Sequence, residues 1–440
     1  MLAAAGASVG LGNIWRFPYL AAKYGGGIFL IIYIVLALTF GYTMIVAETA
    51  IGRMTRKSPV GAFKSFGKKK WLSFGGWINA VIPVLIVPYY SVIGGWVIKY
   101  LVEYFRGNAK LLAEDGYFTD FISNGVSTEL CFVAFCAFTL IIIFAGVQNG
   151  IERVSKIMMP ILIVLSVIIA VYSVTRPGAL AGVKYFLVPN VKNFSWMTVV
   201  SAMGQMFYSL SIAMGILITF GSYMKKDTAI EDSTRNVEIF DTGIAIMAGL
   251  MIIPAVFAFS GGDPDTLQAG PSLMFITIPK VFQNMGFGTV IGIVFFLLVL
   301  FAAVTSSIAL TESAVSTFED ELGWGRKKAT VLVGVIMLAL GSLSSLGYGP
   351  LAGIKIIGMQ FLDLFDFLTN SVMMPIAALL TSLLVSRVVG IDKIEDEIIH
   401  GESAFRRKKV FVVMIKYLCP VFAIIILLSS VANALGWIKM

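Results

Sequence analysis

Charged residues, histidine and cysteine are all scarce in this sequence. Only 13% of its 440 residues are charged and 58% are apolar, whereas a soluble domain carries about a quarter charged residues. The single histidine, His400, argues against a histidine-based catalytic triad or a histidine-rich metal site. The three cysteines (Cys131, Cys136 and Cys419) lie in apolar runs without metal-ligand spacing, so neither a disulfide framework nor a zinc module is expected. This composition argues against an ordinary soluble enzyme.

Long apolar runs dominate the sequence instead. A helix needs about 20 mostly apolar residues to cross a bilayer. Eleven runs of this kind lie at residues 2–22, 28–51, 72–102, 128–146, 151–175, 196–222, 238–260, 288–317, 329–346, 361–386 and 410–436. The runs are continuous rather than alternating, which favours helices over strands. The sequence therefore predicts an all-α membrane protein with eleven transmembrane helices, and a shorter stretch at 271–285 predicts helical pieces in a loop.

Lysine and arginine are distributed unevenly between the predicted loops. The loops after the second, fourth, sixth, eighth and tenth runs hold 21 of the 33 Lys and Arg residues. The positive-inside rule places these loops in the cytoplasm. The net charge of +8 is then a topology signal and a contact with inner-leaflet lipid, not a nucleic-acid-binding surface. The first run has no basic n-region and no cleavage site, so we expect no signal peptide and an N-terminal tail that is incompletely represented.

Two of the runs contain residues that interrupt a helix. The first run carries Gly6, Gly10, Gly12 and Asn13. Glycine destabilises a helix by about 1 kcal/mol per position relative to alanine, and non-helical backbone in a membrane is tolerated only against protein or a wet cavity. We therefore expect unwinding around residues 8–13, with close packing through small residues as the alternative. The sixth run carries a similar break around residues 206–214, with Gln205, Ser209, Ser211 and Gly215.

The two predicted breaks lie five runs apart. In transporters with an inverted repeat, a broken helix recurs at the corresponding position of each half, and the binding site lies between the two at mid-membrane. This spacing predicts one repeat at 1–175 with helices 1–5, a second at 176–390 with helices 6–10, and a cytoplasmic loop with helix 11 at 391–440. Exposed carbonyls can bind a small cation and free amides an anion. Sodium together with a zwitterionic amino acid suits that combination.

Several polar side chains inside the runs are candidate ligands or gates. Hard cations prefer oxygen ligands, which the runs offer at Asn13, Ser209, Asp241, Thr305 and Ser306. Asp241 could instead be an ordinary acid at the cytoplasmic end of its helix, and Thr305 could bond to its own helix carbonyls. Ionisable groups in a membrane are functional candidates by default. Glu48 could cap its helix, while Arg16 and Asp366 could pair as an outer gate.

The first run also carries a recognisable motif. Gly6-Ala-Ser-Val-Gly10-Leu-Gly12-Asn13-Ile-Trp-Arg16-Phe-Pro18-Tyr, followed by Gly25-Gly26-Gly27, resembles the first-helix signature of the neurotransmitter:sodium symporters, in particular their bacterial amino-acid branch. The resemblance covers essentially the whole chain. Its weaker motifs are Gly150-Ile-Glu-Arg, Gln205-Met-Phe-Tyr-Ser209-Leu-Ser211, Thr305-Ser306-Ser307, Phe318-Glu-Asp320-Glu and Leu364-Phe-Asp366-Phe.

The resemblance implies two sodium sites and one substrate site. The first sodium site, which touches the substrate carboxylate, would use Ser8, Asn13, Ser209 and Asp241. The second would use Gly6, Val9, Ala302, Thr305 and Ser306. The carboxylate would also meet Leu11, Gly12 and Tyr90. The substrate side chain would lie among Ile86, Ile93, Tyr208, Ser211, Met214 and Leu310.

The resemblance also implies residues that open and close the transporter. Arg16 and Asp366 resemble the outer gate pair, with Tyr208 as an aromatic lid. Asp320 resembles the inner-gate acid, whose arginine partner would lie in the missing N-terminal tail. Gly150 and Pro160 match a spacing that is linked to unwinding of the inner half of the fifth helix.

Some residues depart from the patterns of other family branches. Chloride-dependent relatives keep neutral residues around a chloride site near Tyr33, Gln205 and Ser209, whereas Asp241 would supply a fixed negative charge here. Chloride independence is therefore expected. Monoamine-carrying relatives have an aspartate at the position of Gly10, so this chain favours a substrate with its own carboxylate. A flexible methionine at 214 can vacate volume for bulky aliphatic or aromatic side chains.

Taken together, these features predict a sodium-coupled symporter that imports neutral, hydrophobic or aromatic amino acids by alternating access. Its partners would be two sodium ions, the amino acid and membrane lipid, in a bacterial cytoplasmic membrane. A substrate-gated channel and an amino-acid sensor with a transporter fold remain alternatives. A membrane enzyme is disfavoured because no embedded nucleophile and base occur at motif spacing.

Overall fold

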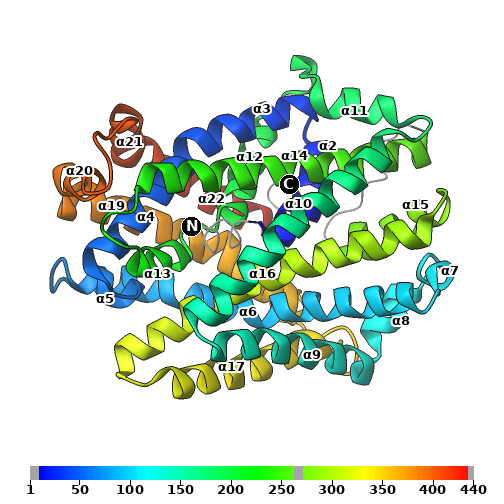
Figure 1. Ribbon diagram of the computed structural model, residues 1–440, viewed down its shortest axis with the longest axis horizontal. Helices are drawn as coiled ribbons and strands as arrows, with labels where there is room; N and C mark the ends of the chain where they lie inside the picture. Colours follow the sequence, from blue (N-terminus) through cyan, green and yellow to red (C-terminus); the bar gives the residue numbers. More distant parts are fainter. Residues whose placement is uncertain (1–8, 262–270, 435–440) are drawn as a thin grey trace.

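The computed structural model describes residues 9–261 and 271–434. These residues fold almost entirely into helices, and no strand occurs in the described ranges beyond two isolated bridges. The all-α prediction is confirmed. In Figure 1 the long helices run across the view, with the short helices α5 (Pro59–Lys64) and α20 (Ile391–Ile399) at the left-hand end. That end carries the basic loops, so the positive-inside rule makes it the cytoplasmic end.

Nine helices in the described ranges are long and apolar enough to cross a membrane. Five are single α-helices: α6 (Lys70–Phe105), α9 (Gly125–Phe144), α14 (Ile230–Ser260), α16 (Gly288–Leu322) and α17 (Arg326–Leu346). Four contain a π-helical turn. These are Gly27–Thr55 with α3 (Gly27–Leu36) and α4 (Tyr42–Thr55), Gly150–Val174 with α10 (Arg153–Val174), Phe361–Val389 with α18 (Phe361–Asp366) and α19 (Met374–Leu384), and Lys408–Asn433 with α21 (Lys408–Val413) and α22 (Cys419–Ala434).

The remaining two predicted spans are the interrupted ones. The sixth consists of α12 (Trp196–Ser209) and α13 (Ile216–Tyr223), with non-helical residues 210–215 between them, so its predicted break is confirmed. The first span is non-helical at residues 9–10 and continues as a π-helix (Gly12–Arg16) and α2 (Phe17–Lys23). Its residues 1–8 lie outside the described ranges. Nine continuous helices, the interrupted sixth span and the described part of the first span therefore correspond to the eleven predicted spans.

Short helices cover the outer end of the bundle. They are α7 (Ala109–Leu112), α8 (Tyr117–Ser123), α11 (Ala179–Leu187) and α15 (Ile278–Gln283), the last preceded by a π-helix at Leu273–Thr277. Helical pieces were predicted at 271–285, and the structure confirms them. α7, α11 and α15 lie toward the right-hand end of Figure 1, opposite the basic loops.

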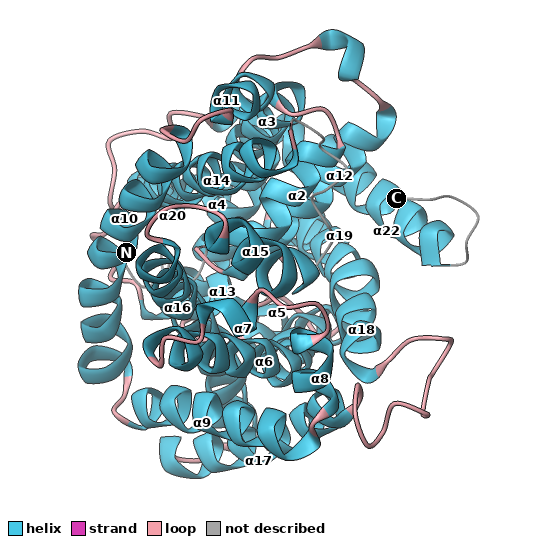
Figure 2. Ribbon diagram, turned by 90° about the vertical axis from the view of Figure 1, so that its right-hand side faces the viewer, coloured by secondary structure: helices cyan, strands magenta, loops and turns pink. Residues whose placement is uncertain are grey.

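Burial separates the central helices from those at the edge. In α6 and α16 the most apolar stretches are 78% and 72% buried inside the protein, against 39% in α9 and 44% in α17. Figure 2 looks along the spans and shows α9 and α17 together at one edge. Their outward-facing apolar side chains are not covered by other helices and are suited to contact with lipid. The central helices instead supply the walls of the site.

Small residues allow the inner half of the sixth span to approach the second span. A Cβ atom on Gly52 of α4 would lie 2.0 Å from the carbonyl oxygen of Ile218, and one on Gly221 of α13 would lie 2.5 Å from that of Thr49. Neither position has room for a larger residue. Glycines that let two backbones meet are typical of helix contacts in membranes. This contact fixes the position of α13 against α4, and therefore the position of the inner end of the break.

Candidate functional site

The break in the sixth span contains residues with an unusual backbone conformation. Ser211, Ala213 and Gly215 have φ angles of 54°, 59° and 71°, in the left-handed region. For residues other than glycine this conformation costs about 1–3 kcal/mol each, so surrounding contacts must maintain it. One of these contacts is a hydrogen bond of 2.7 Å from the Ala213 amide to Oε1 of Glu48, a fully buried residue of α4. Glu48 therefore supports the break instead of capping its own helix.

Asp241 joins both interrupted helices. Its Oδ1 accepts hydrogen bonds from Nδ2 of Asn13 (2.8 Å) and from Oγ of Ser209 (2.6 Å), and its Oδ2 accepts one from the hydroxyl of Tyr33 (2.5 Å). Asn13 also donates to Ser209 at 2.8 Å and accepts from the Gly10 amide at 3.1 Å. All these groups are buried, and Asp241 is fully buried rather than placed at the cytoplasmic surface. The cluster combines one negative charge with several neutral oxygens.

A second group of oxygens lies where the eighth span meets the first. Oγ1 of Thr305 is 3.1 Å from the Ala302 carbonyl oxygen and 3.5 Å from that of Val9. Oγ of Ser306 is 3.3 Å from the same Val9 oxygen. Thr305 is also 3.1 Å from its own helix carbonyl at Phe301, so the back-bonding alternative describes part of its geometry. Four neutral oxygens thus converge here, a donor set that suits a hard monovalent cation.

A small cavity lies between the two oxygen groups. Its volume is about 30 Å³, which by this measure holds about two water molecules. Eight of the predicted substrate-contact residues line it, namely Leu11, Gly12, Ile86, Tyr90, Tyr208, Ser211, Met214 and Leu310. Gly10, Asn13, Ser209, Ile216 and Ser306 complete the wall. The breaks therefore do lie against a cavity, as non-helical backbone in a membrane requires.

Backbone amides and one aromatic ring shape this cavity. The Leu11 amide donates to the Tyr90 hydroxyl at 3.3 Å. The Tyr208 ring lies so close to the Gly12 backbone that a Cβ atom on Gly12 would be 2.4 Å from it. At Gly10, a Cβ atom would lie 2.5 Å from Oγ of Ser306. The cavity thus tolerates no side chain at either glycine.

A larger cavity of about 450 Å³ opens on the outer side of Tyr208. Arg16 and Asp366 both line it, but within the described ranges no ion pair joins them. The Arg16 guanidinium lies 5.4 Å from the Tyr208 ring centroid, whereas Asp366 accepts hydrogen bonds from Tyr89 and Asn370. Tyr208 lines both cavities and separates them.

Ile93 belongs to this outer cavity and not to the smaller one. The resemblance had placed it beside the substrate side chain together with Ile86. Both residues are on α6, but seven residues along a helix correspond to a rise of about 10 Å. Ile93 therefore lies nearer the outer end, above the wall that Ile86 forms.

The inner side of the site is closed by contacts between loops and helix ends. Oδ2 of Asp320 accepts a hydrogen bond of 2.5 Å from the Ser58 amide. Arg326 pairs with the buried Glu312 at 2.6 Å, and the Tyr223 hydroxyl donates to the same glutamate at 2.8 Å. The Glu312 contacts join α13, α16 and α17 and were not anticipated from the sequence. A glutamate within a long apolar run was the available signal.

The two residues assigned to opening of the fifth span both lie in helical segments. Gly150 is part of a π-helix at Val147–Glu152, and Pro160 lies inside α10. A Cβ atom on Gly150 would lie 2.1 Å from the Ile142 carbonyl oxygen, so only glycine fits. Two predicted sodium ligands, Gly6 and Ser8, lie outside the described residues.

Comparisons with known proteins give one consistent result. Residues 1–113 and 118–437 match the profile of the Sodium:neurotransmitter symporter family. The sodium-dependent transporter YhdH of Bacillus subtilis is 34% identical over 435 residues, covering 98% of this chain and 96% of the relative. The sodium-dependent transporter MJ1319 of Methanocaldococcus jannaschii is 31% identical over 417 residues, covering 90% and 82%. The crystal structure of MhsT in complex with L-phenylalanine is 35% identical, with a TM-score of 0.87 over 98% of this chain and 97% of that one.

Proposed function

Because the chain belongs to the sodium:neurotransmitter symporter family, we propose that it imports neutral amino acids with hydrophobic or aromatic side chains, together with sodium and without chloride. Family membership makes it a sodium-coupled transporter, and its many apolar helices make it a multi-pass membrane protein. One observation carries the finer proposal. The first and sixth spans, together with α16, bring residues of two groups of buried oxygens to the wall of a single cavity.

The two oxygen groups are the proposed sodium sites. Asn13, Ser209 and Asp241 would bind one ion, completed by the substrate carboxylate and, from the resemblance, the Ser8 carbonyl. Val9, Ala302, Thr305 and Ser306 would bind the other, completed by the Gly6 carbonyl. The charge at Asp241 favours a cation in the first group. In the second group, neutral oxygens replace the hydration shell of the ion.

The cavity wall supports an amino acid with a bulky apolar side chain. Amides of Leu11 and Gly12 and the Tyr90 hydroxyl would bind its carboxylate. The part of the wall that would contact the side chain carries no charge, because Ile86, Ile216 and Leu310 form it. At about 30 Å³ the cavity is smaller than such a side chain, so Tyr208 and the flexible Met214 must move when it binds. The neighbour MhsT binds L-phenylalanine, which is consistent with a pocket of this kind.

Chloride independence is supported by the contacts of Asp241. The Tyr33 and Ser209 hydroxyls, which the resemblance places at the chloride site of other relatives, already donate to this carboxylate. The carboxylate of Asp241 would therefore supply the negative charge that a bound chloride ion would otherwise have to supply.

Alternating access would follow from the two closures of the site. The outer cavity reaches Tyr208, whereas contacts of Asp320 and Glu312 close the inner side. We propose that substrate closes Tyr208 and brings Arg16 and Asp366 together. Movement of repeat 1–175 against repeat 176–390, with unwinding between Gly150 and Pro160, would then open the inside.

The test is uptake by protein reconstituted in proteoliposomes. A panel of neutral amino acids would be supplied under an inward gradient of sodium or potassium, with chloride or gluconate as the anion. We expect saturable, concentrative uptake of hydrophobic or aromatic amino acids that needs sodium and not chloride. Sodium flux that does not saturate would instead support a channel, and sodium-dependent binding without uptake would support a sensor. Uptake under potassium alone would refute the proposal.

A further inference from the structure

A second large cavity extends from the cytoplasmic end and shares no lining residue with the two cavities of the proposed transport site. It has a volume of about 520 Å³ and lies between the second span, the start of α14 and the segment before α21. Arginine and acidic side chains line one part of it, and Ile34, Leu38 and Ile239 line another. Leu38 is 48% exposed and Ile239 is 60% exposed, as expected of side chains that face lipid. The cavity is therefore a groove on the membrane-facing surface.

Polarity changes along this groove in one direction. Arg235, Ile239 and Gly243 are four residues apart and share one exposed face of α14. A Cβ atom on Gly243 would meet nothing within 4 Å, so the groove is open there. From Arg235 to Gly243 the helix rises about 12 Å, close to the hydrocarbon depth of one leaflet, about 15 Å. A charged end and an open apolar path match the shape of a phospholipid.

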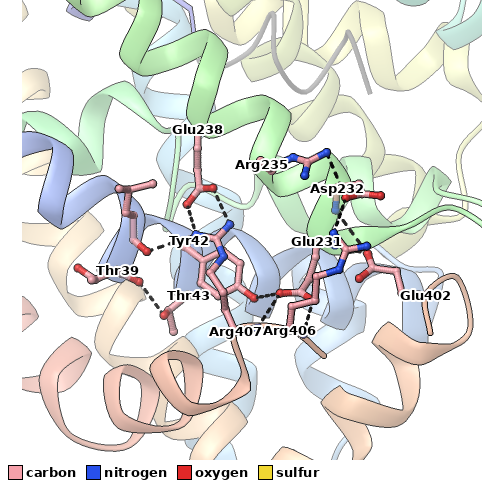
Figure 3. A network of polar contacts seen from close by, with 11 residues as sticks. Thr39, Tyr42, Thr43, Glu231, Asp232, Arg235, Glu238, Glu402, Arg406 and Arg407 are labelled. Atoms are coloured by element: carbon pink, nitrogen blue, oxygen red, sulfur yellow. Dashed lines mark hydrogen bonds and ion pairs between the residues drawn. The ribbon is translucent and has the colours of Figure 1, made fainter. Parts of the chain in front are cut away.

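The deeper charged groups of the groove already have partners within the protein (Figure 3). Arg407 makes two hydrogen bonds to Glu238, at 2.7 and 3.1 Å, and its guanidinium lies 3.6 Å from the Tyr42 ring centroid. Glu231 is buried and accepts hydrogen bonds from the Tyr42 hydroxyl and from the backbone amides of Arg406 and Arg407. These contacts join the second span, α14 and the segment before α21. They leave no deep cation to attract a ligand.

The rim of the groove is different. Arg235 and Arg406 share a single acid, with guanidinium nitrogens 3.4 and 3.2 Å from the same Oδ1 of Asp232. Figure 3 shows Asp232 between the two arginines. Both arginine side chains are 56% exposed. Each guanidinium has five N–H donors, and Asp232 takes only one contact from each. The acids and arginines of the groove balance in number, but both rim guanidiniums keep N–H donors that Asp232 does not take, on exposed side chains at the membrane boundary.

We propose that this groove binds an anionic phospholipid of the cytoplasmic leaflet. Its phosphate would lie between Arg235 and Arg406, and one acyl chain would follow Ile239 and Gly243. Guanidinium groups bind phosphate through paired N–H donors, and basic pockets between spans on the cytoplasmic side suit lipid head groups. The bound lipid links α14 to the segment before α21.

The test uses the full-length protein, stripped of lipid in detergent and titrated with phosphatidylglycerol or phosphatidylcholine. Bound lipid is counted by native mass spectrometry. The wild type is expected to prefer phosphatidylglycerol, and Arg235→Gln/Arg406→Gln to bind it at least about tenfold more weakly. Lys68→Gln/Lys69→Gln removes the same charge from exposed positions at the same end and should bind like the wild type.

A second variant tests the acyl path without changing charge. Gly243→Leu fills the open part of the groove and raises helix propensity, so it is expected to fold and to lose the bound phosphatidylglycerol. Unchanged binding in the double arginine variant, or an equal loss in the lysine control, would overturn the proposal. Displacement of the lipid by inorganic phosphate at equal concentration would also overturn it, because the groove would then be a site for free phosphate.

Discussion

Replacing Asp241 by asparagine removes the one fixed charge of the proposed sodium sites while keeping the shape of the side chain. Two unit charges 4 Å apart interact by about 4 kcal/mol at an effective dielectric constant of about 20. Asparagine still offers one oxygen to the ion, so we expect to lose about 2.7 kcal/mol of this attraction, or roughly 100-fold in sodium affinity. The same change puts an amide NH2 where Oδ2 accepts from the Tyr33 hydroxyl, so this hydroxyl loses its acceptor, whereas the remaining oxygen still accepts from Ser209.

The freed Tyr33 hydroxyl predicts a second effect. A chloride ion can accept hydrogen bonds from this hydroxyl and from the introduced amide NH2 and restore the missing charge, so Asp241→Asn should regain part of its sodium affinity in chloride. The assay is sodium-dependent uptake in proteoliposomes, titrated in chloride and in gluconate. Tyr33→Phe keeps the carboxylate and should shift sodium affinity by less than about tenfold. In the double variant, chloride should no longer help, because one of its two donors is gone.

Two results would refute this reasoning. Sodium dependence of Asp241→Asn equal to that of the wild type would remove the aspartate from the sodium site. Equal chloride stimulation of Asp241→Asn with and without Tyr33→Phe would show that chloride acts elsewhere.

Three further predictions follow from other contacts. Thr305→Val removes the hydroxyl that lies 3.1 Å from the Ala302 carbonyl oxygen and should weaken sodium affinity about tenfold in uptake titrations; unchanged affinity would exclude this hydroxyl as a ligand. Gly10→Ala places a methyl group 2.5 Å from Oγ of Ser306, so amino-acid binding measured by calorimetry should be lost while the protein stays folded; wild-type binding would show that the backbone can yield. Arg53→Met removes the fully buried partner of Glu397 and leaves this buried carboxylate only the half-exposed Lys226, which should destabilise the protein by about 3 kcal/mol and lower its Tm in detergent; an unchanged Tm would contradict that cost.

Residues that act through local backbone chemistry were predictable from the sequence. The break in the sixth span follows from Ser209, Ser211 and Gly215, because glycine and hydroxyl side chains in an apolar run weaken a helix that has no water to replace lost hydrogen bonds. The site residues Asn13 and Thr305 were identifiable for the same reason. The resemblance then assigned the wall of the cavity, and eight of its residues do line one cavity together.

Residues whose contacts depend on how helices rotate and slide were less predictable. Arg16 and Asp366 were expected to pair, but in the structure Asp366 bonds to Tyr89 and Asn370, and Arg16 lies near Tyr208. A charged side chain at the outer cavity has several possible hydrogen-bonding and ion-pairing partners. The sequence does not indicate which of them it contacts. Ile93 lines the outer cavity because it lies seven residues, or about 10 Å, further along α6 than Ile86.

The sequence alone determined which segments are long and apolar enough to cross the membrane and where the sixth of them breaks, because in lipid every backbone group must find its partner within its own helix or beside a cavity. Only the tertiary structure decided that Tyr33 and Ser209 bond to Asp241, 208 and 32 residues away along the chain. It also decided that Arg235 and Arg406 share Asp232 at a groove facing lipid. Such contacts depend on the packing of whole helices against one another, which no short stretch of sequence encodes.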